Sequence, residues 1–551
     1  MKNQIIKFTI FLVLLSISVL SYGSTRLPVD SLVSDFRYFC RMLESSHPDP
    51  YTSFGGRPYF CLARESVADK MAKDSLTIEE FCNLLNEFIM PLHDMHTFIQ
   101  IPRSSVNDIR YVQRIAFTVL HDGLMISGIS KPFEKYLGSN LLSIGGIPLD
   151  SLVHRMAQLK AHENSFDNLQ NLSLWGNQDV ILKKLGVHFD DHILYQLRIA
   201  QGDTVQLHLP LVDSNYLEDV KIVSLQSALK LPDRNLQYAF LDTKKNVMYF
   251  RLSRVMAREN YRYCYDRQWP DALTDIASYY QSVGKKMPEN VEEAISRIPS
   301  FSEEFSNLLK RMKKYNSANL IIDLRGNGGG WSPITLPSLM MMFGDEYFGK
   351  DFDVKSIRLI SDLYLGKMNL SIDQLNQSWG TQLKVGDYFV MNENPDEELF
   401  MKRSRMIQNA LTETPDLLTS LNGKPLYRPK RIFVITDSQT FSAAFHYAFY
   451  LAKMGAELVG VPSGQAPNTF MEVTPFKLPY TGLTGSISNT MQQFFPVDSP
   501  LSKVLQTDID ITLQDYHHFD NDANTPVLKI LECCDCKNLQ SVIVSKRSKC
   551  H

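Results

Sequence analysis

Four glycines stand within residues 326–330, directly after the apolar stretch 319–325. Glycine is needed where the backbone adopts a positive φ or comes very close to another group. A tight turn needs only one or two glycines, and a dinucleotide-binding loop needs another at position 331, which is Trp331. The run therefore favours a loop whose N–H groups face a developing oxyanion, with Gly329 and Gly330 as candidate donors.

Such a loop needs a nucleophile, and Ser442 is the candidate. Residues 431–437 have the apolar pattern of a buried strand, a small-residue turn follows, and residues 445–454 form an apolar, helix-like run. Strand, turn and helix in this order present a serine hydroxyl at a helix N-terminus, where N–H groups and the helix dipole favour negative charge. A serine before a helix is more often only an N-cap, so this turn alone does not identify an enzyme.

Together the two stretches resemble the C-terminal processing (tail-specific) peptidases and their tricorn-core relatives. In that family a strand ending Asp-Leu-Arg-x-Asn-x-Gly-Gly supplies oxyanion donors, a Ser-Ala-x-Glu turn supplies the nucleophile, and a Val-Gly-x-Pro-(Thr/Ser) stretch follows. The matching residues are 323–330, 442–445 and 459–463, with Phe445 where many relatives carry glutamate. The resemblance covers most of the chain after residue 240. It implies an acyl-enzyme on Ser442, with the Ala443 N–H joining Gly329 or Gly330 as oxyanion donors.

The resemblance also indicates a histidine base. The best-known branch of the family uses a lysine that follows the serine, but this chain has Pro467 at that place and no lysine around it. Relatives with an N-terminal helical domain carry an Asp-Gly-His-Thr motif, which residues 94–97 resemble with Met95 in place of glycine. By that analogy His96 is the general base, as in other serine–histidine systems. The family assignment is thus closer to the tricorn-like serine–histidine branch than to the serine–lysine branch.

Other candidates for the base remain open. His93 is close in sequence, His446 lies one helical turn after the serine, and Lys453 lies on the same helix. The acid that would orient His96 is not identifiable, and the tricorn-like branch takes it from beyond the serine. Asp508, Asp510 and Asp515 are candidates there, although their alternating pattern also fits a half-buried strand with its aspartates in water.

The resemblance and the hydrophobic patterning predict an α/β, multi-domain fold with five segments. These are a signal peptide (1–23), an N-terminal helical domain (24–108), a degenerate PDZ-like, β-rich domain (109–215), a crotonase-like ββα-spiral peptidase core with helical insertions (216–530) and a Cys-rich tail (531–551). The insertions lie near residues 255–305 and 345–425, and either could cover the site. A PDZ-type domain binds peptides at a sheet edge, whereas a β-rich spacer would bind nothing.

Composition places the chain among ordinary globular proteins. Of its 551 residues, 44% are apolar and 21% charged, and the net charge of −3 gives no reason to expect nucleic acid as a partner. Lys2 and Lys7, the apolar residues 8–20 and small residues near position 23 form a signal-peptide pattern. We therefore expect an exported protein, periplasmic or secreted, with no membrane span in the mature chain; an uncleaved N-terminal anchor is the alternative.

Export makes disulfides plausible for the eight cysteines. The most obvious pair joins Cys550 to one of the cysteines at 533, 534 and 536, but the sequence does not assign pairs. The same three cysteines lack the two-residue spacer of a usual metal site. No firm motif implies a metal or another cofactor.

The sequence therefore predicts an exported serine endopeptidase that acts on polypeptides, with Ser442 as nucleophile and His96 as base. One alternative is a peptidase-fold protein without catalysis that binds peptide or glycan, which the missing lysine and Phe445 motivate. Another is a crotonase-like acyl-CoA enzyme, but export argues against a cytosolic cofactor and leaves Ser442 without a role. Substrate specificity and oligomeric state are not predicted.

Overall fold

The computed structural model describes residues 26–534 except 73–74, 101–110, 270 and 392–396. The predicted signal peptide, Cys536 and Cys550 lie outside the described residues. The described cysteines at positions 40, 61, 82, 264 and 533 are free thiols. Within the described part of the chain, no helix is both long and apolar enough to cross a membrane.

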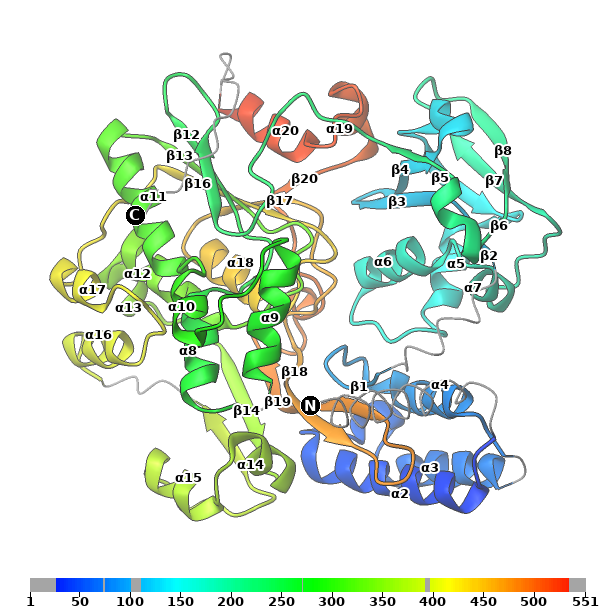
Figure 1. Ribbon diagram of the computed structural model, residues 1–551, viewed down its shortest axis with the longest axis horizontal. Coiled ribbons are helices and arrows are strands. Elements are labelled where there is room, and N and C mark those ends of the chain that lie inside the picture. Colours follow the sequence, from blue (N-terminus) through cyan, green and yellow to red (C-terminus); the bar gives the residue numbers. More distant parts are fainter. Residues whose placement is uncertain (1–25, 73–74, 101–110, 270, 392–396, 535–551) are drawn as a thin grey trace, which may run out of the picture.

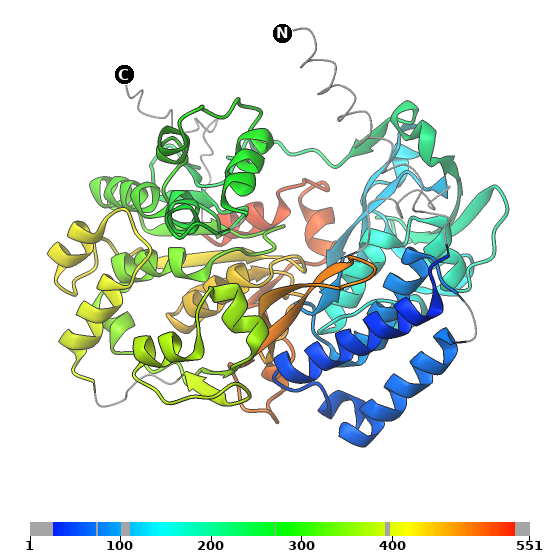
Figure 2. The same ribbon diagram turned by 60° about the horizontal axis from the view of Figure 1, so that its bottom comes forward.

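Three helices form the N-terminal region: α2 (Val29–Ser46), α3 (Arg57–Met71) and α4 (Ile78–Ile89). The expected apolar periodicity is present, and a capping box between Thr77 and Glu80 starts α4. The apolar faces pack against a hairpin of two later strands, β18 (Thr469–Lys477) and β19 (Thr484–Gln493). In both views the orange hairpin lies beside the blue α2 (Figures 1 and 2). The start of the chain is thus joined to its last third.

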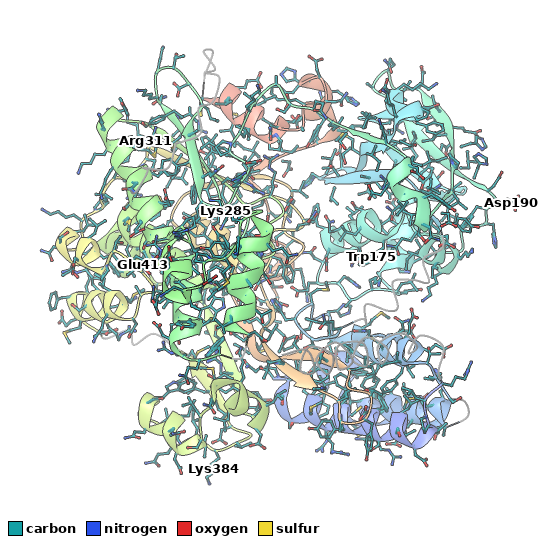
Figure 3. All side chains as sticks on the ribbon, viewed as in Figure 1. Trp175, Asp190, Lys285, Arg311, Lys384 and Glu413 are labelled. Atoms are coloured by element: carbon teal, nitrogen blue, oxygen red, sulfur yellow. The ribbon has the colours of Figure 1, made fainter. Side chains whose placement is uncertain are left out.

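The next region is built on an antiparallel sheet with the path β10-β4-β5-β7-β8, in which β3 also pairs with β4 and β6 with β5. Its strands are β3 (Ile115–Leu120), β4 (Gly123–Ser130), β5 (Asn140–Ile144), β6 (Ile147–Pro148), β7 (His192–Arg198), β8 (Thr204–Pro210) and β10 (Ile222–Ser224). Helices α5 (Leu149–Met156), α6 (Ser165–Trp175) and α7 (Asp179–Lys184) pack against it. The ribbon shows these helices below the sheet, and Trp175 at the end of α6 is labelled among the side chains (Figures 1 and 3).

The core sheet has six strands in the order β11-β12-β13-β16-β17-β20. They are β11 (Gln237–Phe240), β12 (Val247–Arg251), β13 (Asn319–Asp323), β16 (Arg431–Thr436), β17 (Glu457–Gly460) and β20 (Ile509–Asp510), all parallel except β11. Alternate side chains of β13 and β16 enter two different apolar clusters, one on each face of the sheet. Burial on both faces explains their continuous apolar sequences.

Helices cover both faces of this sheet. On one side lie α11 (Phe301–Tyr315), α12 (Leu336–Phe343) and α18 (Ala443–Lys453), and on the other α19 (Leu513–His518) and α20 (Thr525–Cys533). The first insertion forms α8 (Arg258–Asp266), α9 (Ala272–Ser282) and α10 (Val291–Ser296). The second contains α13 (Asp345–Phe348), β14 (Lys355–Leu359), α14 (Asp362–Met368), α15 (Ile372–Trp379), β15 (Tyr388–Met391), α16 (Leu399–Gln408) and α17 (Pro415–Leu421).

A second sheet, ordered β1-β19-β14-β15 with β18 beside β19, joins the second insertion to the N-terminal region. Its first strand, β1 (Phe98–Ile99), pairs antiparallel with Gly485 and Ser486 of β19. Helical, antiparallel and mostly parallel parts together give the predicted mixed α/β, multi-domain class.

Candidate active site

The glycine loop and the serine turn leave the same edge of the core sheet. Strands β13 and β16 are parallel neighbours, and Asp323 at the end of one aligns with Ile435 near the end of the other. Carboxyl ends of adjacent parallel strands are where ligand sites form in open α/β sheets. Two stretches about a hundred residues apart in sequence therefore begin side by side.

Hydrogen bonds fix the two loops to each other. The Gly326 N–H donates to the Asp437 carboxylate (2.8 Å), and the Phe441 N–H donates to the Asn327 carbonyl (2.9 Å). The buried Asn327 side chain donates to the Leu252 carbonyl (2.8 Å) and accepts the Gly329 N–H (2.9 Å). The two loops are thus fixed by polar contacts, and the buried ones made by the Asn327 side chain are costly to leave unpaired.

Two of the predicted glycines are needed by close approach. Gly329 has φ +105°, and a Cβ there would lie 2.7 Å from the Ser442 Cβ and 3.0 Å from the Ala443 nitrogen. Gly330 has φ +143°, and a Cβ there would lie 2.2 Å from the Val255 carbonyl oxygen. The glycine loop is therefore in direct contact with the serine turn at Gly329.

Ser442 has a strained backbone, with φ +53° and ψ −123°, directly before α18. Its side chain makes no capping hydrogen bond, so it does not act as an ordinary N-cap. Its N–H donates to the Oε1 of the buried Gln465. A non-glycine residue held at positive φ costs about 1–3 kcal/mol and is characteristic of functional turns such as a nucleophile elbow. The geometry is suited to a serine hydroxyl presented outside the helix.

The candidate oxyanion donors differ in their hydrogen bonding. The Gly329 N–H already donates to Asn327. In the described part of the chain, the N–H groups of Gly330 and Ala443 have no acceptor. Because an oxyanion hole needs donors without another partner, Gly330 and Ala443 fit this role better than Gly329.

His96 is brought to this edge by the pairing of β1 with β19. The Ser486 hydroxyl donates to the His96 carbonyl (2.6 Å), and the Ser488 N–H donates to the Thr97 hydroxyl (3.0 Å). The imidazole stacks on Phe441, the residue before the serine, with ring centroids 5.1 Å apart and planes inclined by 29°. His96 is 8% exposed, and among the described residues neither ring nitrogen has a hydrogen-bond partner.

Burial lowers the pKa of His96, and the charges of Asp94 and Glu472 oppose this shift. Burial would raise the pKa of Asp94, but its hydrogen bond to His47 and the charges of His47 and His96 lower the pKa to about 2. Asp94 therefore stays ionised, and its carboxylate accepts the His96 backbone N–H (2.8 Å) and lies 3.3 Å from His47 Nε2. A neutral imidazole beside a fixed carboxylate can accept a proton.

The alternative bases lie elsewhere or are already engaged. His446 contacts the Ser332 hydroxyl (2.8 Å) and the Gln492 side chain (2.7 Å), and burial lowers its pKa to about 4. His93 is exposed and faces the His162 carbonyl (3.2 Å). Lys453, at the opposite end of α18, lies over the rings of Phe449 and Phe495.

The three aspartates after the serine have structural contacts. Asp508 accepts the Leu458 N–H (2.7 Å), Asp515 caps α19, and Asp510 lies 3.5 Å from the His121 ring. None of these contacts includes His96. The expected half-buried strand is present only at Asp510 in β20, because Asp508 is exposed before it and Asp515 lies in α19.

A buried acidic group not predicted from the sequence adjoins His96. Potential ligand atoms of Asp94, His96 and Glu163 lie within 4.8 Å of one another, as in a possible metal site. The oxygens of both carboxyl groups already accept hydrogen bonds, from Met95 and Ala466 at Glu163 and from His96, His47 and Thr97 at Asp94. This bonding favours a proton-sharing cluster over a cation site.

Sequence reasoning also missed Gln465 and Glu472. Gln465 lies in the stretch inspected for a lysine, where its amide instead accepts the Ser442 N–H. Glu472 has φ +65° and lies in β18 between Met471 and Val473, which pair with β19 in an unbroken register. No hydrophobic periodicity in the sequence marks either residue.

Residues 294–495, which contain the glycine loop, Ser442 and β18–β19, match the sequence model described as Peptidase family S41. This stretch of the chain belongs to peptidase family S41. It is accordingly a serine-type peptidase, a hydrolase, and the predicted family assignment is confirmed. No curated protein matches the sequence.

Among solved structures, this S41 peptidase is similar to mature CPAF complexed with lactacystin. The TM-score is 0.52 at 15% sequence identity, covering 92% of this chain and 98% of that chain. A second structure of mature CPAF has a TM-score of 0.51 at 16% identity, covering 94% and 99% of the two chains. At these identities the likeness establishes the shared fold only, and it extends over nearly the whole of both chains.

Proposed function

We propose that this S41 peptidase is an exported serine endopeptidase in which Ser442 is the nucleophile and His96 the base. The observation that carries the proposal is the stack of His96 on Phe441, next to Ser442, with both imidazole nitrogens unpartnered among the described residues. A serine hydroxyl is a weak nucleophile until a neighbouring base accepts its proton. The strained backbone of Ser442 supports the same role.

The proposed reaction is acyl transfer followed by hydrolysis. The Ser442 hydroxyl attacks a peptide carbonyl while His96 accepts its proton and then passes it to the leaving amine. The N–H groups of Gly330 and Ala443 stabilise the oxyanion; losing one such donor typically costs about 10²–10³ in rate. Water then attacks the acyl-enzyme with His96 again as base.

A serine–histidine pair, as in the tricorn-like branch, is favoured over a serine–lysine pair. Pro467 occupies the place of the lysine, and Lys453 lies at the far end of α18 against two aromatic rings. Glu163 and Asp94 adjoin the imidazole, and the charge of Glu472, which follows the serine, also acts on it.

Export and the division into domains are further parts of the proposal. Residues 1–23 carry the pattern of a signal peptide, and we infer a periplasmic or secreted mature chain. We also propose that residues 109–215 act as a PDZ-like module, which the antiparallel sheet and the hairpin of β5 and β6 support. The substrate would be a polypeptide.

The test is labelling of the mature protein, residues 24–551, with a fluorophosphonate. We expect stoichiometric labelling that Ser442→Ala abolishes and His96→Ala reduces by about 10² or more, since a positioned base contributes 10²–10⁴-fold. His93→Ala is the matched control, because it removes an exposed histidine from the same turn, and it should label normally. Unchanged labelling of His96→Ala would refute His96 as the base. No labelling at all would favour the peptide- or glycan-binding alternative.

A further inference from the structure

The start of α6 docks onto the loops that hold the serine turn. The Asn164 side chain, which caps α6, donates to the Ser463 carbonyl (2.9 Å) and to the Lys503 carbonyl (3.3 Å). Nearly two turns further, Gln170 accepts a hydrogen bond from the Ser438 hydroxyl (2.5 Å). A helix of the antiparallel region is therefore built into the surroundings of the active site.

Glu163 precedes this cap, and its carboxyl group bridges two loops. Its Oε1 accepts the Met95 N–H (3.3 Å), and its Oε2 accepts the Ala466 N–H (2.9 Å). The residue is 8% exposed. Hydrogen bonds to such a buried carboxyl group are stronger than in water, and their loss leaves backbone donors unpaired.

One of the bridged loops carries His96, and the other contacts the backbone of Ser442. Met95 directly precedes His96 in the turn before β1, whereas Ala466 directly follows Gln465, whose amide accepts the Ser442 N–H. A Glu163 oxygen also lies within 4.8 Å of a His96 ring nitrogen. One side chain thus connects the backbone of the base to the loop that holds the nucleophile.

The surroundings of Glu163 disfavour a charged carboxyl group. Such a residue is a poor choice if its only role is to stabilise the fold. Burial and the charge of Asp94 raise the pKa of Glu163 well above its usual value. In the described contacts Glu163 has no cationic partner. Ionisable groups held in such surroundings concentrate at functional sites, because an apolar residue would otherwise be the more stable choice.

We propose that Glu163 is a positioning residue that fixes His96 relative to Ser442, and this inference rests on the proposed function. Its carboxyl group touches neither reacting atom in the proposed chemistry. It acts through the backbone of Met95 on one side and of Ala466 on the other. The antiparallel region thereby supplies one residue of the peptidase site.

The test compares Glu163→Ala, Glu163→Gln and Gln170→Ala in fluorophosphonate labelling at several probe concentrations. A misplacement of about 1 Å costs about 10²-fold, so Glu163→Ala should lower the maximal labelling rate by about that factor. The probe concentration at half-maximal rate should change little, because probe binding does not involve Glu163. Glu163→Gln keeps the shape and one acceptor oxygen and should lose less. Gln170→Ala removes a contact of α6 with Ser438, which lies in the serine turn but outside both bridged loops, and it should lose far less labelling than Glu163→Ala.

Folding of each variant is checked by circular dichroism and thermal melting. If Glu163→Ala does not fold, the labelling rate of Glu163→Gln tests the inference. Wild-type labelling by a folded Glu163 variant would overturn the inference and leave the proposed function intact. Equal losses in Gln170→Ala would also overturn it, because they would indicate general docking. Loss of wild-type labelling in EDTA, restored by Zn²⁺, would replace it with a metal site. If the wild type never labels, the proposed function fails, and this inference fails with it.

Discussion

Replacement of Gly329 by alanine tests the contact between the glycine loop and the serine turn. The new Cβ would lie 2.7 Å from the Ser442 Cβ and 2.9 Å from the Phe441 carbonyl oxygen. Carbon atoms in contact are about 3.5–4.0 Å apart, so Ser442 would have to move by about 1 Å. The obstacle is backbone and Cβ atoms, not the end of a flexible side chain.

The expected effects on stability and rate follow from this geometry. Position 329 has φ +105°, and a side chain in that region costs about 1–3 kcal/mol in the free energy of unfolding. Displacing the nucleophile by about 1 Å should lower the rate of acylation by about 10²-fold. The protein should therefore remain folded at room temperature while its reactivity falls sharply.

The assay is the second-order rate constant of fluorophosphonate labelling, with thermal melting measured on the same samples. Gly328→Ala is the matched control, since Gly328 is not at positive φ and a Cβ added there would have no heavy atom within 4 Å beyond its chain neighbours. This control should label at the wild-type rate and gain up to about 1 kcal/mol of stability from a less flexible unfolded chain. If folded Gly329→Ala labels as fast as Gly328→Ala, the inferred contact at the nucleophile is wrong.

Two predictions concern pH. Burial lowers the pKa of His96 below its usual value of 6.5. Because the neutral imidazole is the active base, the labelling rate should reach half its maximum only at a pH below 6.5. Glu472→Gln should move that midpoint lower still, because the Glu472 charge raises the pKa of His96; a midpoint above 6.5 in the wild type would contradict the assignment. Burial raises the pKa of Asp167 in α6 from 3.8 to about 7. Between these two values the folded protein keeps a proton on Asp167 that the unfolded chain has lost. The free energy of unfolding should therefore decrease as pH rises from 4 to 7, by up to about 4 kcal/mol. The melting temperature of Asp167→Asn relative to that of the wild type should therefore be higher at pH 8 than at pH 5. The same difference between variant and wild type at the two pH values would exclude this account.

Local sequence patterns were sufficient to predict much of the core. The apolar runs of β13 and β16 are buried on both faces, so their type and position follow from composition alone. The glycines at 329 and 330 meet backbone atoms that leave no room for a Cβ, which is why the spacing indicated a close approach. The helix after Ser442 was likewise readable from its apolar run.

The surroundings of His96 were not predictable in the same way. His446 has the spacing of a second site residue on α18, yet its ring is held between Ser332 and Gln492. Gln465 and Glu163 belong to irregular loops without any period, and their partners lie on other elements. A lone polar residue in a loop has many possible partners, and the sequence does not rank them.

By itself, the sequence determined the strands, the glycine loop, the serine turn and the peptidase family, because each is a short-range pattern of burial and backbone conformation. Only the tertiary structure decided which residues complete the site. His96 reaches Phe441 because β1 pairs with β19, and Glu163 reaches both loops because α6 docks beside them. Contacts between residues hundreds of positions apart depend on how sheets and helices pack, and no local preference of the chain encodes them.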